Sequence, residues 1–140
     1  MSPLLEYTKI TDARSAIGEI YSTAECHLAV VMRRENDAPI AVIRRDDLKQ
    51  ALRALRPLKP QVRFSPDEHV SMWIEGLPVS GEGATFDTAG QDLIDSLKEY
   101  SRTWVEDLRN YPNHKQNWDV VNLTLLSDDD ELRVHLFGDD

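Results

Sequence analysis

Two short apolar runs separated by charged residues constrain the fold of this chain most strongly. They lie in "VVMRRENDAPIAVIRRDDL", residues 30–48, where an arginine pair follows each run and Pro39 opens the second. Proline cannot donate a hydrogen bond to a sheet, so Pro39 must stand at the start of a strand or turn its nitrogen outward. The stretch therefore predicts a β-hairpin, with strands at 27–33 and 39–43 and the polar turn "RENDA" between them.

Helical patterns lie on both sides of this hairpin. Upstream, residues 11–24 repeat small and apolar side chains near helical spacing. Downstream, residues 44–56 carry leucine and alanine on one face, behind two aspartates whose charge suits the start of a helix. Together with a short strand at 4–10, these patterns predict a β-α-β-β-α module over residues 1–56.

Prolines separate this first module from the rest of the chain. The stretch "PLKPQ", residues 57–61, ends the second helix and predicts a stiff linker, which we place at 57–66. Apolar side chains at every second position of residues 70–75 predict a half-buried strand. A glycine-rich turn follows, and we expect a further short strand at 84–86.

The second half contains the longest helical pattern of the chain. We expect Thr88 to cap this helix and Asn110 to end it. Its buried face is predicted to consist of residues at helical steps, Leu93, Leu97, Tyr100, Trp104 and Leu108. Residues 118–137 fit either strands or two short helices, and we favour the helices, with the second beginning at Ser127. The fold class predicted for the whole chain is α+β, and residues 67–140 form a small α+β module with one long helix.

The charge is distributed unevenly along the sequence. The whole chain has a formal net charge of −9, but residues 1–63 hold 11 Lys/Arg against 8 Asp/Glu, a net +3. Residues 64–140 hold 5 Lys/Arg against 17 Asp/Glu, a net −12. This asymmetry predicts a first half that meets phosphates and a second half that meets a basic protein. The alternative is that the acidic residues only keep the chain soluble.

Few residues suit catalysis, metal binding or a membrane. Cys26 is the single cysteine, so no internal disulfide can form, and a reducing cytoplasm is the expected location. No apolar run approaches the roughly 18 residues of a membrane span. The four histidines lack metal-ligand spacing, so we expect no metal and no cofactor. The stretch "SDDDE", residues 127–131, could hold a divalent cation, but it lacks the spacing and glycine of a calcium loop, which favours a helix start.

The first module resembles the Phd/YefM family of antitoxins from bacterial toxin–antitoxin systems. In that family a Thr/Ser-x-Ala-Arg helix start follows the first strand, a Pro-Val-Ala-Val-like strand closes the hairpin, and an acidic residue opens the next helix. The matching residues here are Thr11, Asp12, Ala13 and Arg14, then Pro39, Ile40, Ala41, Val42 and Ile43, then Asp46, Asp47 and Leu48. The resemblance covers about residues 4–56.

This resemblance implies a homodimer that binds operator DNA and represses its own operon. The positions carried over as DNA contacts are Lys9, Thr11, Arg14 and Ser15. Further candidates for phosphate contacts, by charge alone, are Arg33, Arg34, Arg44 and Arg45. The alternative for these arginines is pairing with the neighbouring carboxylates Glu35, Asp37, Asp46 and Asp47.

The second module is similar over residues 70–100 to the HicB antitoxin pattern, in which a strand and a glycine-containing turn precede a helix. We therefore predict an antitoxin, not an enzyme, that binds and neutralises an RNA-cleaving toxin. The candidate toxin anchors are Trp118, Leu132 and Phe137, and the alternative is that these residues pack on the long helix. The rival function is a small metal-dependent hydrolase or nuclease that uses the acidic tail.

Overall fold

The structure is a computed structural model that describes residues 5–138. Leu4 of the first predicted strand, and Asp139 and Asp140 of the acidic half, lie outside the described residues. The chain divides into two compact units, Met1–Gln50 and Ala51–Asp140. This division falls inside a helix and not in the linker that the prolines predict.

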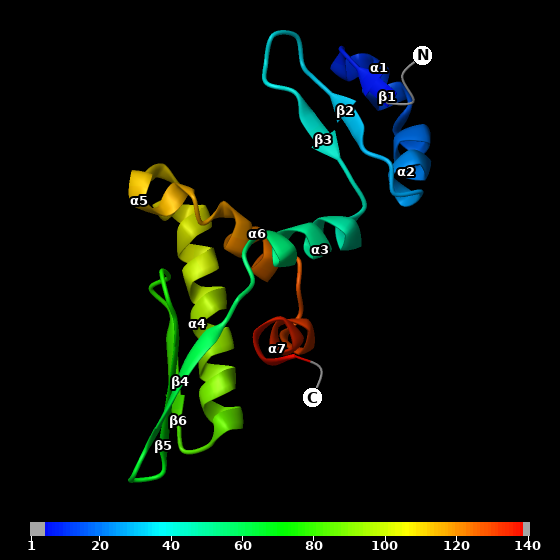
Figure 1. Cartoon of the computed structure of the whole chain (residues 1–140). Coiled ribbons are helices and arrows are strands. Elements are labelled where there is room, and N and C mark those ends of the chain that lie inside the picture. The colour runs from blue at the N-terminus through cyan, green and yellow to red at the C-terminus, as the bar shows by residue number, and fades with distance from the viewer. Residues whose placement is uncertain (1–4, 139–140) are drawn as a thin grey trace. The chain divides into compact units, whose positions relative to one another are not determined.

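The first unit contains the predicted hairpin and the helices beside it (Figure 1). Its elements are β1 (Leu5–Tyr7), α1 (Ile10–Ser15), α2 (Ile17–Glu25), β2 (Val30–Met32), β3 (Ile40–Val42) and the start of α3 (Arg45–Leu55). Strand β2 is central, pairing parallel with β1 and antiparallel with β3. Its strands are shorter than predicted, because the polar turn extends up to Pro39.

The helix predicted over residues 11–24 is divided in two at Ala16. The backbone of Ala16 leaves helical geometry, with φ −112° and ψ 23°, and its N–H bonds to the carbonyl of Ala13 at 3.1 Å. This tighter turn ends α1 and starts α2 at a new angle. The core of the unit is small: Ala13, Ile20 and Val30 are buried, and Leu5, Tyr7, Met32 and Val42 pack against them.

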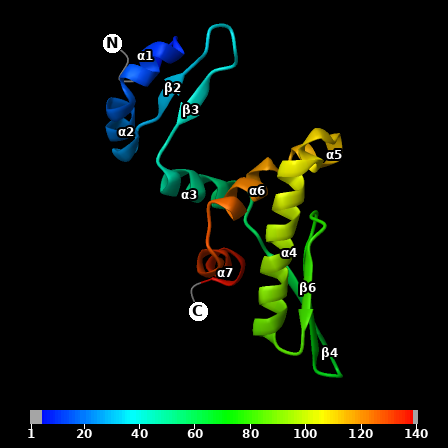
Figure 2. The ribbon, with the colours of Figure 1, turned by 180° about the vertical axis from the view of Figure 1, so that it is seen from behind.

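The second unit is a three-stranded sheet with the long helix on it, and the last two helices pack against that helix (Figures 1 and 2). Its elements are β4 (Pro60–Ser65), β5 (His69–Ile74), β6 (Ser80–Gly83), α4 (Phe86–Glu106), η1 (Leu108–Asn110), α5 (Pro112–Lys115), α6 (Trp118–Leu125) and α7 (Asp129–Phe137). The strands form an antiparallel meander in the order β4-β5-β6. Val70, Met72 and Ile74 are buried and Trp73 is exposed, which confirms the alternation predicted for β5.

Four predicted boundaries in this unit are wrong. Strand β4 occupies most of the predicted linker at 57–66. The third strand is β6 and not residues 84–86, because Gly81 and Gly83 let this segment lie directly against α4, where a side chain would clash. Helix α4 is capped by Thr85, whose side chain accepts the N–H of Thr88, and it ends at Glu106 before Asn110.

The tail, residues 118–137, consists of the two helices α6 and α7, as the sequence favoured. Helix α7 begins after Asp128, not Ser127, because Asp128 and Glu131 form a reciprocal capping box. Three residues of the predicted stripe, Leu93, Leu97 and Tyr100, are buried on α4, which packs against β5, β6, α6 and α7. The other two, Trp104 and Leu108, are only half-buried, because α4 ends at Glu106 and Leu108 lies in η1. Within residues 5–138, no helix combines the length and the apolar character needed to span a membrane.

Candidate functional site

The four residues predicted to contact DNA lie together around the short helix α1. Lys9 is the N-terminal cap residue, and Thr11, Arg14 and Ser15 are exposed on the helix. Ser15 donates from its hydroxyl to the carbonyl of Thr11 at 3.1 Å, one turn away. Because residues three and four apart share a helix face, the structure brings Thr11, Arg14 and Ser15 to one side of α1.

Some cationic side chains of the first unit are paired with a carboxylate, and others have no such partner among the described residues. Arg34 donates to Asp37 at 2.8 Å, and Arg45 to Asp46 at 3.3 Å. Arg44 lies 3.8 Å from Asp46 and 3.7 Å from Asp47. By contrast, the side chains of Lys9, Arg14 and Arg33 form no hydrogen bond or ion pair with any residue from 5 to 138. These three cations therefore remain available to phosphates.

Arg34 also lies beside the residues predicted to contact DNA. The sequence did not reveal this proximity. The turn between β2 and β3 brings Arg34 and Glu35 to an open hollow that Thr8, Lys9, Ile10 and Thr11 also line. Glu35 has φ +51°, a left-handed conformation that turns the chain here. The sequence shows a charged turn and a helix start, but it does not show the pairing of strands that brings these two segments together.

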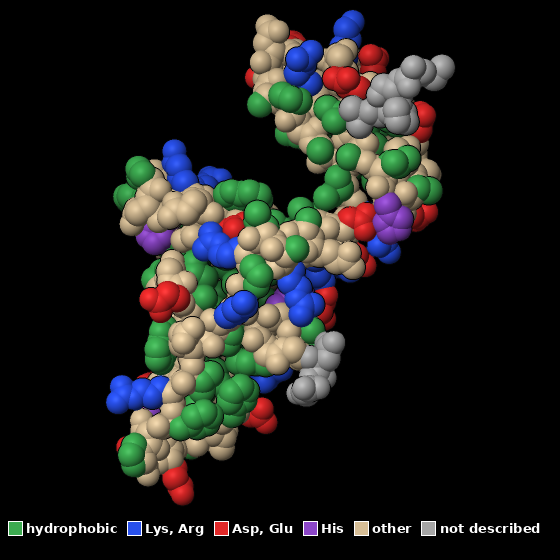
Figure 3. All heavy atoms as spheres, viewed as in Figure 1, with side chains coloured by type: hydrophobic (Ala, Val, Ile, Leu, Met, Phe, Trp, Pro, Cys, Tyr) green, Lys and Arg blue, Asp and Glu red, His purple; other side chains and the backbone are tan. Residues whose placement is uncertain are grey.

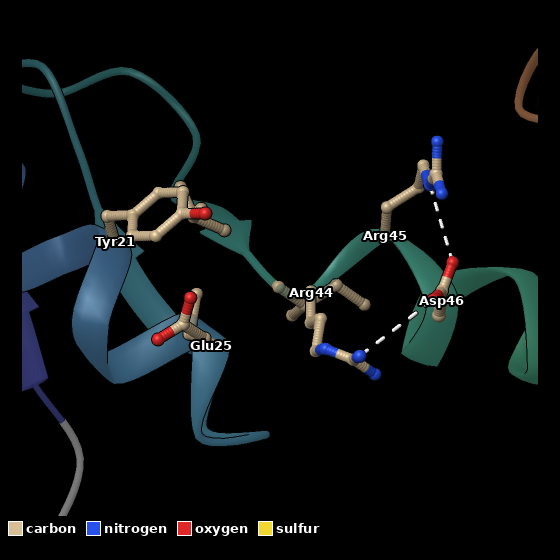
Figure 4. A pocket seen from close by; sticks show the side chains of 8 residues that line it. Tyr21, Glu25, Arg44, Arg45 and Asp46 are labelled. Carbon is tan, nitrogen blue, oxygen red and sulfur yellow. Dashed lines mark hydrogen bonds and ion pairs between the residues drawn. The ribbon is translucent and has the colours of Figure 1, made fainter.

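A second hollow lies between α2 and the start of α3 (Figure 4). Its apolar part comes from Tyr21, Ala24, Val42 and Ile43, and its charged part from Glu25, Arg44, Arg45 and Asp46. Tyr21 is 69% exposed. The first unit also exposes Ile10, Ile17, Leu28 and Ile40, so a large share of its apolar surface remains uncovered. Figure 3 shows hydrophobic side chains, in green, reaching the surface.

The three predicted toxin anchors lie in different environments. Trp118 is 48% exposed at the start of α6. Leu132 is completely buried, and Phe137 packs edge-to-face on Phe86 with ring centroids 5.0 Å apart. Gly90 of α4 gives Phe137 the space it occupies. Leu132 and Phe137 therefore pack within the unit, as the alternative to toxin binding had it. Of the three residues, Trp118 is the one with a large exposed surface.

The acidic stretch 127–131 is used to hold helix α7. Asp128 caps the helix with Glu131, and Asp129 accepts from Lys98 at 2.9 Å and from Gln91 at 3.1 Å. The hydrogen bonds from Lys98 and Gln91 lower the pKa of the Asp129 carboxyl. Across residues 5–138, no group of His, Cys, Asp and Glu side chains is arranged to hold a metal ion.

A polar network that the sequence did not reveal joins α3 to the tail. Arg56, at the end of α3, donates to both carboxylate oxygens of Asp119, at 2.7 and 3.0 Å, and to Asn117 at 3.0 Å. Asn117 donates to the Tyr100 hydroxyl, which lies 2.8 Å from the Nδ1 atom of His114. Asp119 and Asn117 are buried, so this network fixes the tail on α4.

These features define a class of protein: a small mixed α+β binding protein, with free cations on the first unit and an acidic second unit. The PHD-like family model, described as the antitoxin of a toxin–antitoxin system of the RelE/RelB kind, matches residues 1–136. The chain therefore belongs to this antitoxin family, which implies a toxin as its partner. The match spans both units.

One solved structure has the same fold. It is the crystal structure of the antitoxin part of a putative toxin/antitoxin system from Syntrophomonas wolfei subsp. wolfei. The TM-score is 0.78 and the sequences are 19% identical, with 97% of each chain covered. No curated protein matches the sequence significantly.

Proposed function

We propose that this antitoxin neutralises an RNA-cleaving toxin by binding it directly, and that it represses its own operon by binding operator DNA in the cytoplasm. The observation that carries the proposal is that cations at α1 have no partner among residues 5–138, while the acidic residues are concentrated later in the sequence. Lys9 caps α1 and Arg14 lies in its last turn, each without a partner among residues 5–138, while the sequence from residue 64 onward has a net charge of −12. Such a chain can bind DNA and a basic protein through different surfaces.

The first unit supports the DNA-binding part of the proposal. Lys9 and Arg14, whose side chains have no partner among residues 5–138, lie beside the hydroxyls of Thr11 and Ser15, and all four residue types donate to phosphate oxygens. The exposed apolar residues of this unit favour a homodimer like that of Phd/YefM antitoxins, which would read a two-fold operator. A monomer at high micromolar concentration, measured by light scattering, would contradict the homodimer.

Arg14→Ala should weaken operator binding while leaving the fold intact. Arg14 is exposed and has no partner within residues 5–138, so its loss removes a phosphate contact and no internal bond. We expect about a fivefold to tenfold loss of affinity and a shallower dependence on salt, measured by fluorescence anisotropy with DNA from upstream of the operon.

Arg45→Ala is the matched control for this test. It removes an arginine of the same unit that is already paired, with Asp46 at 3.3 Å, and it should change affinity about twofold at most. If Arg14→Ala binds this DNA as tightly as the unchanged chain does, α1 is not the DNA-binding element.

The second unit supports the toxin-binding part. An RNA-cleaving protein is basic around its substrate channel, so an acidic partner gains in association rate and places carboxylates where phosphates would lie. Trp118 is an exposed aromatic residue of the kind that anchors interfaces. The purified protein of the adjacent reading frame should cleave RNA, and one equivalent of this chain should stop the cleavage. Undiminished cleavage would contradict the proposal.

The rival function, a metal-dependent hydrolase or nuclease, has no observation in its favour. It would require carboxylates or histidines grouped at ligand distances, and the described residues contain no such group. Of the acidic stretch, Asp128 and Glu131 cap α7, and Asp129 binds Lys98 and Gln91.

A further inference from the structure

The sheet of the second unit has two edge strands, and they differ in how they are protected. At the β6 edge, the N–H of Ser80 donates to the Ser96 hydroxyl at 3.2 Å, and that of Glu82 donates to the Asp92 carboxylate at 2.9 Å. Both acceptors belong to α4, which lies directly against Gly81. Helix α4 therefore closes the β6 edge, as natural sheets require of an edge that must not pair.

These two bonds also establish which backbone groups of the sheet point outward. Because Ser80 and Glu82 turn their N–H groups away from β5, the β6 residues that bond to β5 are Gly81 and Gly83, opposite Met72 and Val70. In an antiparallel sheet, successive residues turn their backbone groups to opposite sides. Ser71 and the other alternate residues of β5 therefore bond to β4.

The same alternation places two residues of β4 at the free edge. Arg63 is opposite Ser71 and Gln61 is opposite Trp73, so these two β4 residues bond inward to β5. Val62 and Phe64 consequently turn their N–H and C=O groups out of the sheet. In residues 5–138 no further strand pairs with β4, and no other backbone segment bonds to these groups.

The β4 edge carries few of the usual devices that prevent pairing, although Arg63 places one exposed charge on it. Its pairing with β5 runs without interruption from Pro60 opposite Ile74 to Ser65 opposite His69, so there is no bulge. Proline occurs only at its first position. The side chains of Val62 and Phe64 share the face of buried Met72, yet Phe64 is 69% exposed, because α4 packs on β5 and β6. An added strand would satisfy the backbone groups and cover Phe64.

We propose that the free edge of β4 binds an extended strand of the toxin, which adds to this sheet as a fourth strand. The inference rests on the proposed toxin partner and assigns the surface that it uses. A second copy of the chain is disfavoured as the occupant, because it would bring together two copies of the second unit, whose residues 51–140 each hold 9 Lys/Arg against 17 Asp/Glu, a net −8. The strand that fits is basic overall, with apolar side chains beside Val62 and Phe64 and backbone groups that pair with β4.

Val62→Pro tests this pairing in the full-length chain. Proline removes the outward N–H and obstructs an incoming strand, while the bonds from β4 to β5 use residues 61, 63 and 65 and remain. Val62→Thr is the matched control, because it keeps the N–H and a β-branched side chain. For binding to the purified protein of the adjacent reading frame, we expect at least about a tenfold loss with Val62→Pro and about a threefold loss at most with Val62→Thr. Tryptophan fluorescence verifies that both variants are folded.

Hydrogen exchange of individual backbone amides gives an independent measurement. In the free chain, the amides of Gln61 and Arg63 should be protected by β5, and those of Val62 and Phe64 should exchange rapidly. Adding the partner should protect Val62 and Phe64. Equal binding by the two Val62 variants, or unchanged exchange at Val62 and Phe64, would overturn strand addition while leaving the antitoxin function intact.

Two other outcomes are distinguishable from these. If the unchanged chain does not bind the purified protein at all, the proposed function itself fails, and the assignment of the toxin as occupant fails with it. If Val62→Pro changes the sedimentation of the chain in the absence of any partner, the edge pairs with a second copy, which also overturns the assignment.

Discussion

At the scale of single residues, Arg56 should stabilise the second unit through its bonds to a buried carboxylate. It donates to both oxygens of Asp119, whose side chain is only 9% exposed. Arg56→Ala would leave that carboxylate buried without its cation, which should cost about 2–3 kcal/mol. Urea unfolding monitored by tryptophan fluorescence measures this loss, since all three tryptophans belong to the second unit. Arg53→Ala is the control and should cost about 0.5 kcal/mol or less, because Arg53 makes one long bond, 3.4 Å to the Val134 carbonyl.

Asp129 should give the second unit a small dependence on pH. Hydrogen bonds from Lys98 and Gln91 lower the pKa of this carboxyl in the folded chain. A depressed folded pKa contributes stability above the unfolded value of 3.8, and this contribution is lost as the pH falls through the folded pKa. Because the group is largely exposed, the contribution should be about 0.5 kcal/mol. Asp129→Asn should therefore destabilise the unit at pH 7 and have no effect near pH 2, and an equal effect at both would contradict the assignment.

At the scale of elements, periodicity predicted the types of the helices and strands better than their ends. The stripe on α4 and the alternation in β5 follow directly from side-chain spacing, because each buries one face. The break at Ala16 and the cap at Thr85 depend on hydrogen bonds that spacing does not encode. The strand β6 has the sequence "SGEG", with no apolar residue, and exists because its glycines fit against α4.

The tail helices should be part of the core of the second unit. Deleting residues 113–140 removes side chains with exposed fractions of 6% or less, Val120, Val121, Leu123, Leu132 and Leu136. At about 1.5–3 kcal/mol for each, the loss is comparable to the total stability of a small domain. The shortened chain should therefore lose the cooperative unfolding transition of Trp73 and Trp104. A transition that is retained would show that the tail is dispensable for folding.

Trp118→Ala separates partner binding from folding in the same tail. Trp118 is 48% exposed, so its truncation should cost about 1 kcal/mol of stability or less. If Trp118 anchors the toxin, the variant should remain folded by circular dichroism and lose about tenfold or more in affinity for the purified partner. Unchanged affinity would remove Trp118 from the interface.

At the scale of the whole molecule, the antitoxin role could be predicted from local signals of the first unit, while the packing of the second could not. The hairpin with Pro39 and the order of the elements around it are local signals. The second unit depends on contacts between distant residues, such as Arg56 with Asp119 and Phe86 with Phe137. The family match over residues 1–136 spans both units, whereas the sequence had suggested a different antitoxin pattern for each.

Co-expression tests the central claim, that this chain neutralises a toxin by binding it, most directly. The protein of the adjacent reading frame is expressed alone and together with this chain, and growth and co-purification are measured in the same cells. The account predicts that growth stops with the partner alone, resumes when the chain is present, and that the two proteins purify together in a fixed ratio. Growth that stays arrested although both proteins are present and folded, with no complex recovered, would contradict it.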